Sequence, residues 1–260
     1  MKPKILVWDI ETSPMVTYNF GLYDQNIRID QIKEDWTILS WGAKWLGDLD
    51  SKAIYKDNRH SKNVRDDKQL VASLIELLEE ADICITHNGD NFDIKRVNTR
   101  ALLNGLPPYK HPKSTDTYKE SKKVFSLTYN SLEYTSTNVN KKYQKLKHEE
   151  YPGLSLWKEV LKGNNHAWDV MKKYCLHDVF ATEEYFNAIQ GWIKTQNLAC
   201  YFDDSTIRCL CGSDRIIKKG FAYTDSGKYQ GYKCLDCGKR PKGKINLFDA
   251  TKKKSLLKDK

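Results

Sequence analysis

The sequence has no hydrophobic run that approaches the roughly 20 residues needed to cross a bilayer. Its first apolar stretch, in MKPKILVWDIETS, is broken by Asp9 and is too short for the hydrophobic core of a secretory signal. We therefore expect a soluble protein of the cytoplasm that does not enter membranes. In that compartment its seven cysteines should stay reduced.

Glutamate is missing from the last 60 residues of the chain. There, fifteen lysines and arginines face seven aspartates, so this segment holds most of the net charge of +9, and the first 200 residues are nearly neutral. Such an asymmetry favours a basic C-terminal module that meets a polyanion, most simply nucleic acid. The alternative is a solvated, lysine-rich tail.

The order of the expected elements predicts an α/β architecture, a mixed sheet with helices packed on it. Strands are expected at residues 4–11, 37–46, 52–57 and 83–86. Longer helices are expected at 66–80, 92–104 and about 167–193, and shorter ones at 117–125 and 131–138.

Three groups of acidic residues are candidates for chemistry. Asp9 and Glu11 share one face of the first strand, and their mutual repulsion would be relieved by a cation or by protonation. Asp93 follows the strand 83–86 in the first turn of a helix, where ordinary capping would also explain it. Asp178 lies within an apolar stripe of the long helix, and Tyr174 precedes it by one turn. A surface strand end and core packing remain the alternatives for the pair and for Tyr174.

These motifs, in this order, resemble the DEDD superfamily of 3′–5′ exonucleases in its tyrosine-bearing branch. The motifs are D-x-E in WDIETSP, N-x-x-x-F-D in HNGDNFD and Y-x-x-x-D at Tyr174. The histidine-bearing branch would place a histidine at position 173, where this chain has Lys173. The segments GLPP, STDT, SLEY and AWDVMKKY, with the terminal cysteines, look like stand-alone exonuclease-like proteins of bacteria and phages.

The resemblance implies a ribonuclease H-like fold with a mixed five-stranded sheet, and a two-metal 3′–5′ exonuclease that favours DNA, single-stranded above all. It implies that Asp9, Glu11, Asp93 and Asp178 hold two Mg²⁺ or Mn²⁺ ions, with Tyr174 beside the attacking water. The residues expected to contact substrate here are Thr12, His87, Asn88 and Asn91. Asp116 is expected to support the site from behind. Two alternatives remain: a non-catalytic nucleic-acid-binding protein, and a nuclease of the same chemistry that acts on RNA or on internal or branched sites.

The remaining motif is a pair of cysteine knuckles. Cys234 and Cys237 form C-x-x-C followed by glycine, and Cys209 and Cys211 form a shorter C-x-C. With the hairpin expected between them, they predict a zinc ribbon, although the short first knuckle leaves Cys200 as an alternative ligand and free thiols as another reading. The domains are expected at 1–198, 199–248 (the ribbon) and 249–260 (a flexible basic tail). Within the ribbon, the expected nucleic-acid contacts are Lys218, Tyr229 and Lys233; aromatic packing on the zinc core is the alternative.

Overall fold

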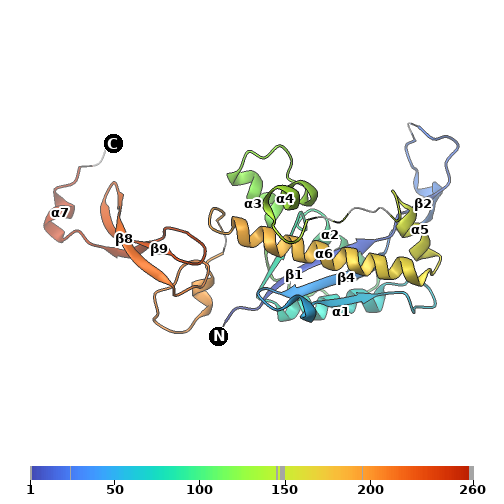
Figure 1. Ribbon diagram of the computed structural model, residues 1–260, viewed down its shortest axis with the longest axis horizontal. Coiled ribbons are helices and arrows are strands. Elements are labelled where there is room, and N and C mark those ends of the chain that lie inside the picture. Colours follow the sequence, from blue (N-terminus) through green and yellow to red (C-terminus); the bar gives the residue numbers. More distant parts are fainter. Residues whose placement is uncertain (1, 24, 145, 147–149, 195, 258–260) are drawn as a thin grey trace. The chain divides into compact units, whose positions relative to one another are not determined.

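The computed structural model describes residues 2–23, 25–144, 146, 150–194 and 196–257. The chain forms two compact units, a larger one at Lys4–Phe186 and a smaller one made mainly of Asn187–Lys260. Figure 1 shows the elements of both units along the sequence.

A five-stranded sheet forms the centre of the larger unit, in the order β5-β4-β1-β6-β7. The strands are β1 (Ile5–Thr12), β4 (Ile38–Trp45), β5 (Ile54–Asp57), β6 (Ile83–Thr86) and β7 (Lys113–Asp116). β4 runs antiparallel to both β1 and β5, whereas β6 is parallel to β1 and to β7. The predicted mixed sheet is therefore confirmed, and the first four predicted strands are all present.

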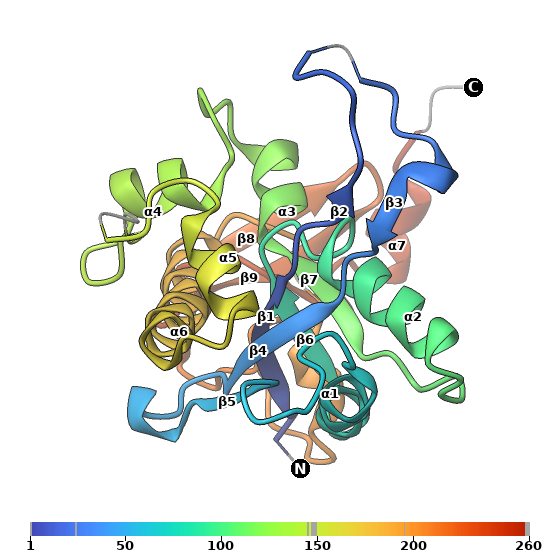
Figure 2. The ribbon, with the colours of Figure 1, turned by 90° about the vertical axis from the view of Figure 1, so that its right-hand side faces the viewer.

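Helices cover both faces of this sheet (Figure 2). They are α1 (Lys68–Glu80), α2 (Asp93–Leu103), α3 (Thr117–Val124), α4 (Leu132–Val139), α5 (Ser155–Leu161) and α6 (Asn165–Ile189). A two-stranded arm of β2 (Val16–Thr17) and β3 (Ile32–Glu34) projects from the body, and the sequence pattern does not predict it. Among the described residues, no helix combines the length and hydrophobicity that a bilayer span requires.

The two faces of β1 have different roles. Leu6, Trp8 and Ile10 are buried in the main hydrophobic core with apolar residues of α1 and α2. Because side chains alternate along a strand, Asp9 and Glu11 lie on the opposite face. Helix α6 packs on that face, and the thiol of its Cys175 lies 3.8 Å from the carbonyl oxygen of Asp9.

Gly42 of β4 allows α6 to approach the sheet closely. A Cβ atom at this position would lie 3.0 Å from the Cys175 Sγ atom and 3.3 Å from a methyl carbon of Leu176. Further along the helix, the buried Lys44 of β4 forms an ion pair with Glu183 of α6 at 2.6 Å. Packing at Gly42 and the ion pair at Lys44 together fix α6 over β1 and β4.

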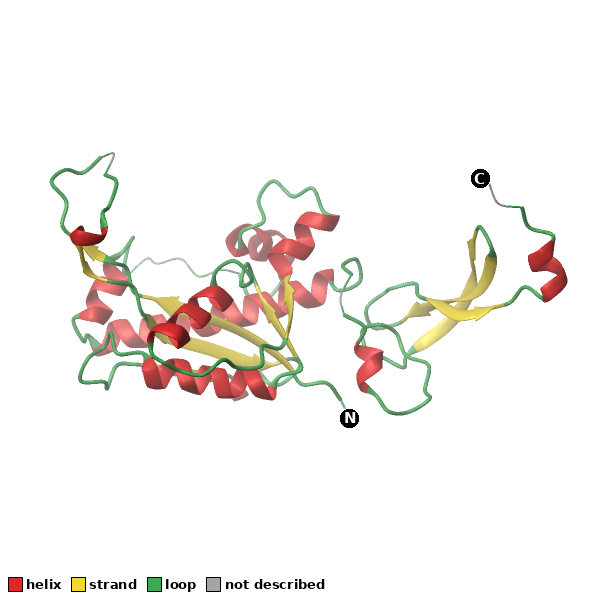
Figure 3. Ribbon diagram, turned by 180° about the vertical axis from the view of Figure 1, so that it is seen from behind, coloured by secondary structure: helices red, strands yellow, loops and turns green. Residues whose placement is uncertain are grey.

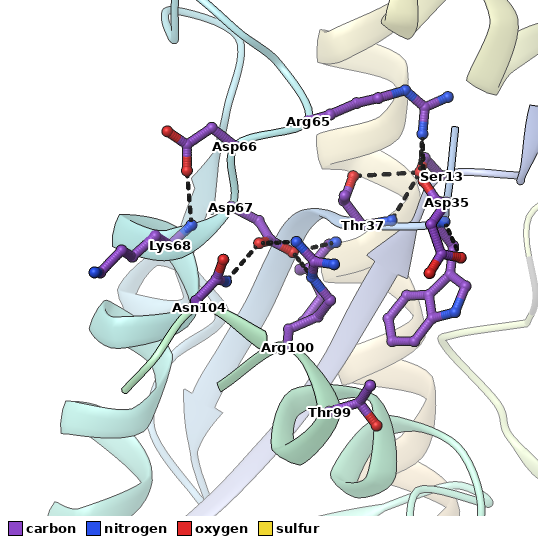
Figure 4. Close-up of polar contacts among 12 residues, drawn as sticks. Ser13, Asp35, Thr37, Arg65, Asp66, Asp67, Lys68, Thr99, Arg100 and Asn104 are labelled. Atoms are coloured by element: carbon purple, nitrogen blue, oxygen red, sulfur yellow. Dashed lines mark hydrogen bonds and ion pairs between the residues drawn. The ribbon is translucent and has the colours of Figure 1, made fainter. Parts of the chain in front are cut away.

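A buried carboxylate fixes the other helical layer (Figure 4). Asp67, fully buried before α1, accepts hydrogen bonds from the Arg100 guanidinium at 2.7 and 2.8 Å and from Asn104 at 2.8 Å. It also accepts the backbone N–H of Ile38 at 2.8 Å. A buried charge is stable only when it is paired and fully hydrogen-bonded, and this network meets that requirement. Asp67 thereby joins α1, β4 and α2.

The smaller unit is built on a three-stranded sheet in the order β10-β9-β8. Its elements are β8 (Ile216–Thr224), β9 (Gly227–Cys234), β10 (Lys242–Asn246) and the short helix α7 (Ala250–Lys254) (Figure 3). The hairpin turn lies between Thr224 and Gly227, within the stretch expected from the sequence. The sequence pattern did not predict α7, which lies in the segment expected to be a flexible tail, and residues 258–260 of that tail lie outside the described residues.

Candidate functional site

The two carboxylates of β1 lie opposite small residues of β4. Asp9 lies opposite Gly42 and Glu11 lies opposite Ser40 in the β1–β4 ladder. Directly opposed residues share a face of a sheet, so both carboxylates lie on the face of β1 and β4 against which α6 packs. Glu11 is buried and Asp9 is half-buried.

Asp93 is positioned by the end of the parallel pairing between β1 and β6. That pairing extends only to Val7 and Ile85, so the N–H of Ile10 faces no partner on β6. Asp93, the first residue of α2, accepts this N–H at 3.3 Å and is 3 % exposed. Burial raises the pKa of Asp93 to about 7, although its hydrogen bonds to backbone N–H groups act in the opposite direction. The α2 helix thus delivers a third carboxylate beside β1.

Asp178 and Tyr174 are supplied by α6. Asp178 is 6 % exposed, and Tyr174, one helical turn earlier, is also buried. Both lie in the part of α6 that packs over Gly42 through Cys175 and Val179. The helix therefore places them above the face of β1 that carries Asp9 and Glu11.

The buried thiol of Cys175 lies between α6 and the face of β1 that carries Asp9 and Glu11. Burial is the largest cause that raises its pKa well above the usual range, and the negative charges of Asp9, Glu11, Asp178 and Asp93 raise it further. Electrostatic effects of this kind fall off with distance, so each of the four carboxylates lies near enough to this thiol to raise its pKa. The structure thus places these four acids, which the family resemblance implies as metal ligands, around β1 and the part of α6 that packs on it.

The loop after β6 carries three of the residues predicted to contact substrate. Asn88 has a φ of 65°, and its side-chain oxygen accepts a hydrogen bond from Asn91 at 3.1 Å. Both ring nitrogens of His87 lie within hydrogen-bond distance of protein groups, the Thr117 hydroxyl at 2.9 Å and a backbone carbonyl at 2.8 Å. A substrate contact from His87 would have to displace one of these partners.

Asp116 holds this loop in place. It caps α3 by accepting N–H groups of Tyr118 and Lys119, and it also accepts the N–H of Asn88 at 2.8 Å and of Asp90 at 3.3 Å. Burial raises the pKa of Asp116, against the effect of these N–H donors. The strand-end acid therefore connects β7 and α3 to the loop that leads into Asp93.

A cavity of about 400 Å³ adjoins Glu11, one of the four acids. Glu11 and Thr12 line it on one side, and Trp36, Phe92 and Arg96 on another. The Arg96 guanidinium lies 4.1 Å from the Trp36 ring centre and 4.6 Å from that of Phe92. Aromatic rings can stack on nucleobases, and a guanidinium group can bind phosphate. No sequence motif connects Trp36 and Arg96 to the acids, so the sequence alone does not indicate these two residues.

The chemistry of the four acids fits hard divalent cations. Carboxylate oxygens are the preferred ligands of Mg²⁺ and Mn²⁺. Asp93 in particular is buried, and burial raises its pKa because its negative charge is poorly compensated. A nearby divalent cation would compensate that charge.

A second potential metal site lies in the smaller unit. The thiols of Cys209, Cys211, Cys234 and Cys237 all lie within 4.8 Å of one another, and in the described part of the chain no other group of three or more such ligands is as tight. The sulfur–sulfur distances of 3.6 and 3.7 Å are close to the edge of a tetrahedron with 2.3 Å zinc–sulfur bonds, about 3.8 Å. The four cysteines named from the sequence could therefore hold one structural zinc ion.

The short C-x-C knuckle forms despite its spacing. Gly212 has a φ of 86° and its N–H donates to the Cys209 carbonyl at 2.8 Å, which turns the chain immediately behind the second thiol. Cys200, the alternative ligand, is exposed and outside the cluster. Burial raises the pKa of Cys209 to about 11, whereas at Cys234 hydrogen bonds from backbone N–H groups and from neighbouring thiols together outweigh burial and lower the pKa to about 7.

Comparisons with known proteins give the following matches. A family model of the RNase H superfamily matches residues 45–190, which include Asp93, Tyr174 and Asp178 and begin after Asp9 and Glu11. A 54-residue segment, 20 % of the chain, is 39 % identical to a DNA polymerase of Methanocaldococcus jannaschii, of which it spans only 3 %. Among solved structures, the family B DNA polymerase of the archaeon Pyrobaculum calidifontis matches with a TM-score of 0.49 at 14 % identity. That match covers 73 % of this chain and 25 % of the polymerase.

Proposed function

The chain belongs to the RNase H superfamily, and from this premise we propose that it is a metal-dependent 3′–5′ exonuclease that favours single-stranded DNA. The observation that carries the proposal is the position of the acids: Asp9 and Glu11 lie on the face of β1 under α6, Asp93 accepts the N–H of Ile10, and Asp178 lies on α6 one turn after the buried Tyr174. Carboxylates brought together at a partly buried site are costly unless cations neutralise them. A nuclease uses such cations on the phosphate that it cleaves.

Each acid has a distinct position from which to act. Asp9 and Glu11 come from a rigid central strand, Asp93 from a helix start and Asp178 from α6. Two divalent ions held between them would stabilise the attacking and leaving oxygens of an in-line displacement at phosphorus. The protein's own contribution is to fix the carboxylates before substrate arrives, which limits reorganisation during the reaction.

Tyr174 and the adjoining cavity orient the reactants. The phenol of Tyr174, one turn before Asp178 on α6, would hold the attacking water by a hydrogen bond. The cavity beside Glu11 would receive the terminal nucleotide, with its base against the Trp36 and Phe92 rings and its phosphate near Arg96. Tight positioning of this kind contributes much of the rate enhancement of an enzyme.

The test is digestion of labelled single-stranded DNA, duplex DNA and RNA, each carrying the label at the 5′ or the 3′ end. With Mg²⁺ or Mn²⁺, we expect 5′-labelled single-stranded DNA to shorten progressively, and 3′-labelled DNA to release mononucleotide first. Asp9→Asn combined with Asp178→Asn should reduce the rate by about 10³-fold or more, since several kcal/mol of metal-assisted stabilisation is lost.

A matched control on the same helix is Asp169→Asn, which removes a carboxylate that pairs with Arg59 on the surface of α6. This variant should cleave at the wild-type rate. Internal fragments would indicate an endonuclease, and faster digestion of RNA would change the substrate. Metal-independent binding without cleavage would support the non-catalytic alternative and overturn the proposal.

A further inference from the structure

One face of the three-stranded sheet in the smaller unit carries exposed aromatic rings. Phe221 is 50 % exposed and Tyr223 is 66 % exposed, and both belong to β8. The sequence left open whether such rings pack on a zinc core or face solvent. For Phe221 and Tyr223 the structure shows the second arrangement.

Lysines occupy the same face as these rings. Lys228 of β9 lies directly opposite Tyr223, and its ammonium is 4.0 Å from the Phe221 ring centre and 6.0 Å from that of Tyr223. Lys218 of β8 lies opposite Tyr232, which shares a face with Lys228 because the two are four residues apart on β9. We call Lys218, Phe221, Tyr223 and Lys228 the ring face of the sheet.

The other face is built differently. Tyr229 lies over Gly227, where an added Cβ would come within 2.7 Å of its ring, and Lys242 covers that ring at 4.4 Å. Lys233 lies on this face as well, opposite Ile217. The sheet therefore separates the three predicted contacts: Lys218 is on the ring face, and Tyr229 and Lys233 are on the opposite one.

The chemistry of the ring face matches an extended polynucleotide. Phe221 and Tyr223 are two residues apart on one strand, so their Cα atoms are separated by roughly 6.6 Å, a spacing that allows consecutive unstacked bases to meet consecutive rings. The hairpin of β8 and β9 holds four lysines against one aspartate, so its charge complements phosphates. A neutral or basic protein partner would lack this complementarity.

We propose that the ring face binds single-stranded DNA, with bases stacked on Phe221 and Tyr223 and phosphates contacted by Lys228 and Lys218. The choice of DNA as the ligand rests on the proposed function, whereas the location of the face rests on the register of β8 and β9. Stacking on rings and contact with phosphates are both independent of base identity, so binding should tolerate any sequence.

The test is fluorescence anisotropy with a labelled oligothymidylate and the full chain carrying Asp9→Asn and Asp178→Asn, so that the probe stays intact. Adding Phe221→Ala and Tyr223→Ala should weaken binding at least about 20-fold, since each ring loses one stacked base. Lys228→Gln should weaken binding and reduce the slope of log affinity against log salt by about one.

The matched controls lie on the opposite face. Ile217→Ala and Lys233→Gln are each added to the Asp9→Asn/Asp178→Asn chain. The affinity of each for the oligothymidylate should stay within about twofold of that of the chain without the added substitution. Equal zinc content in all variants shows that the sheet is intact. A loss for Lys233→Gln with none for Phe221→Ala/Tyr223→Ala overturns the proposal, as does preference for an oligouridylate or for duplex DNA. These binding results stand whether or not the unsubstituted chain cleaves DNA, so the two proposals fail separately.

Discussion

The two candidate metal sites of this chain are assembled in opposite ways. The acidic site gathers Asp9, Glu11, Asp93 and Asp178 from a strand and two helices across some 170 residues, and those elements pack on a large apolar core. The cysteine site is made by two short turns within 29 residues. The fold thus determines the geometry of the first site, whereas the ligands of the second are positioned locally.

The difference extends to what each metal would do for stability. The larger unit buries most of the apolar side chains of the described chain, while the three-stranded sheet of the smaller unit is mainly exposed along β8 and β10. A sheet with so little apolar burial depends on another source of stability. We therefore expect zinc to hold the smaller unit together, and we expect the larger unit to fold without its cations.

The largest effect should follow from breaking the cysteine site. Zinc bound by four thiolates contributes about 10–16 kcal/mol to folding in small domains, more than this sheet can replace. Cys237→Ser should abolish stoichiometric zinc and expose β8 and β9 to proteolysis, while the fragment at Lys4–Phe186 stays resistant. Metal analysis and limited proteolysis followed by mass spectrometry measure both results.

Cys200→Ser is the control, because this exposed cysteine lies outside the cluster. It should retain one zinc per chain and the wild-type cleavage pattern. If the sheet stayed protected in Cys237→Ser, the cysteines would be ordinary thiols and the contrast between the two sites would be lost.

The second effect is the loss of unfolding free energy that the buried acidic residues cause when no metal is bound. The pKa of Asp93 is raised from 3.8 to about 7, so between these values the folded state holds a proton that the unfolded chain has lost. The free energy of unfolding should then fall as pH rises from about 4 to 7, by up to about 1.4 kcal/mol per pH unit. Urea denaturation in metal-free buffer measures this slope.

In Asp93→Asn the slope should flatten, and at pH 8 the variant should be more stable than the wild type. At pH 8, added Mg²⁺ should raise the free energy of unfolding of the wild type and leave that of Asp93→Asn unchanged. Glu76→Gln, which neutralises an exposed carboxylate of α1, should behave like the wild type. An equal slope in Asp93→Asn would mean that another group governs the pH dependence.

The comparison also shows what the sequence can predict. The alternation in KILVWDIE and the helical spacing around Asp178 predict strands and helices correctly because each pattern is local. The C-x-x-C knuckle is likewise local. The five-stranded sheet is confirmed, but β7 escaped prediction because KSTD has no apolar residue and is placed only by pairing with β6.

Long-range packing limits prediction at the site itself. Asp93 was recognised as a candidate, yet its contact with the N–H of Ile10 depends on where β6 ends relative to β1. Trp36 and Arg96 come together only after α2 docks beside β4, so no spacing in the sequence indicates them. In the same way, only the register of β8 and β9 shows which side chains share a face of that sheet.

The smallest effect tests whether packing alone positions the acids. Gly42→Ala adds a Cβ at 3.0 Å from Cys175 Sγ, so α6 must shift by a few tenths of an ångström, at a cost of about 1–3 kcal/mol in unfolding free energy. Because Asp178 lies on the displaced helix, kcat should fall more than KM changes. Adding Cys175→Ala to this variant removes the sulfur atom that the new Cβ contacts. The double variant should recover much of the lost unfolding free energy and of the lost kcat. If Gly42→Ala left kcat unchanged, the acidic site would tolerate movement of its helix, and its geometry would depend on bound cations as the cysteine site does.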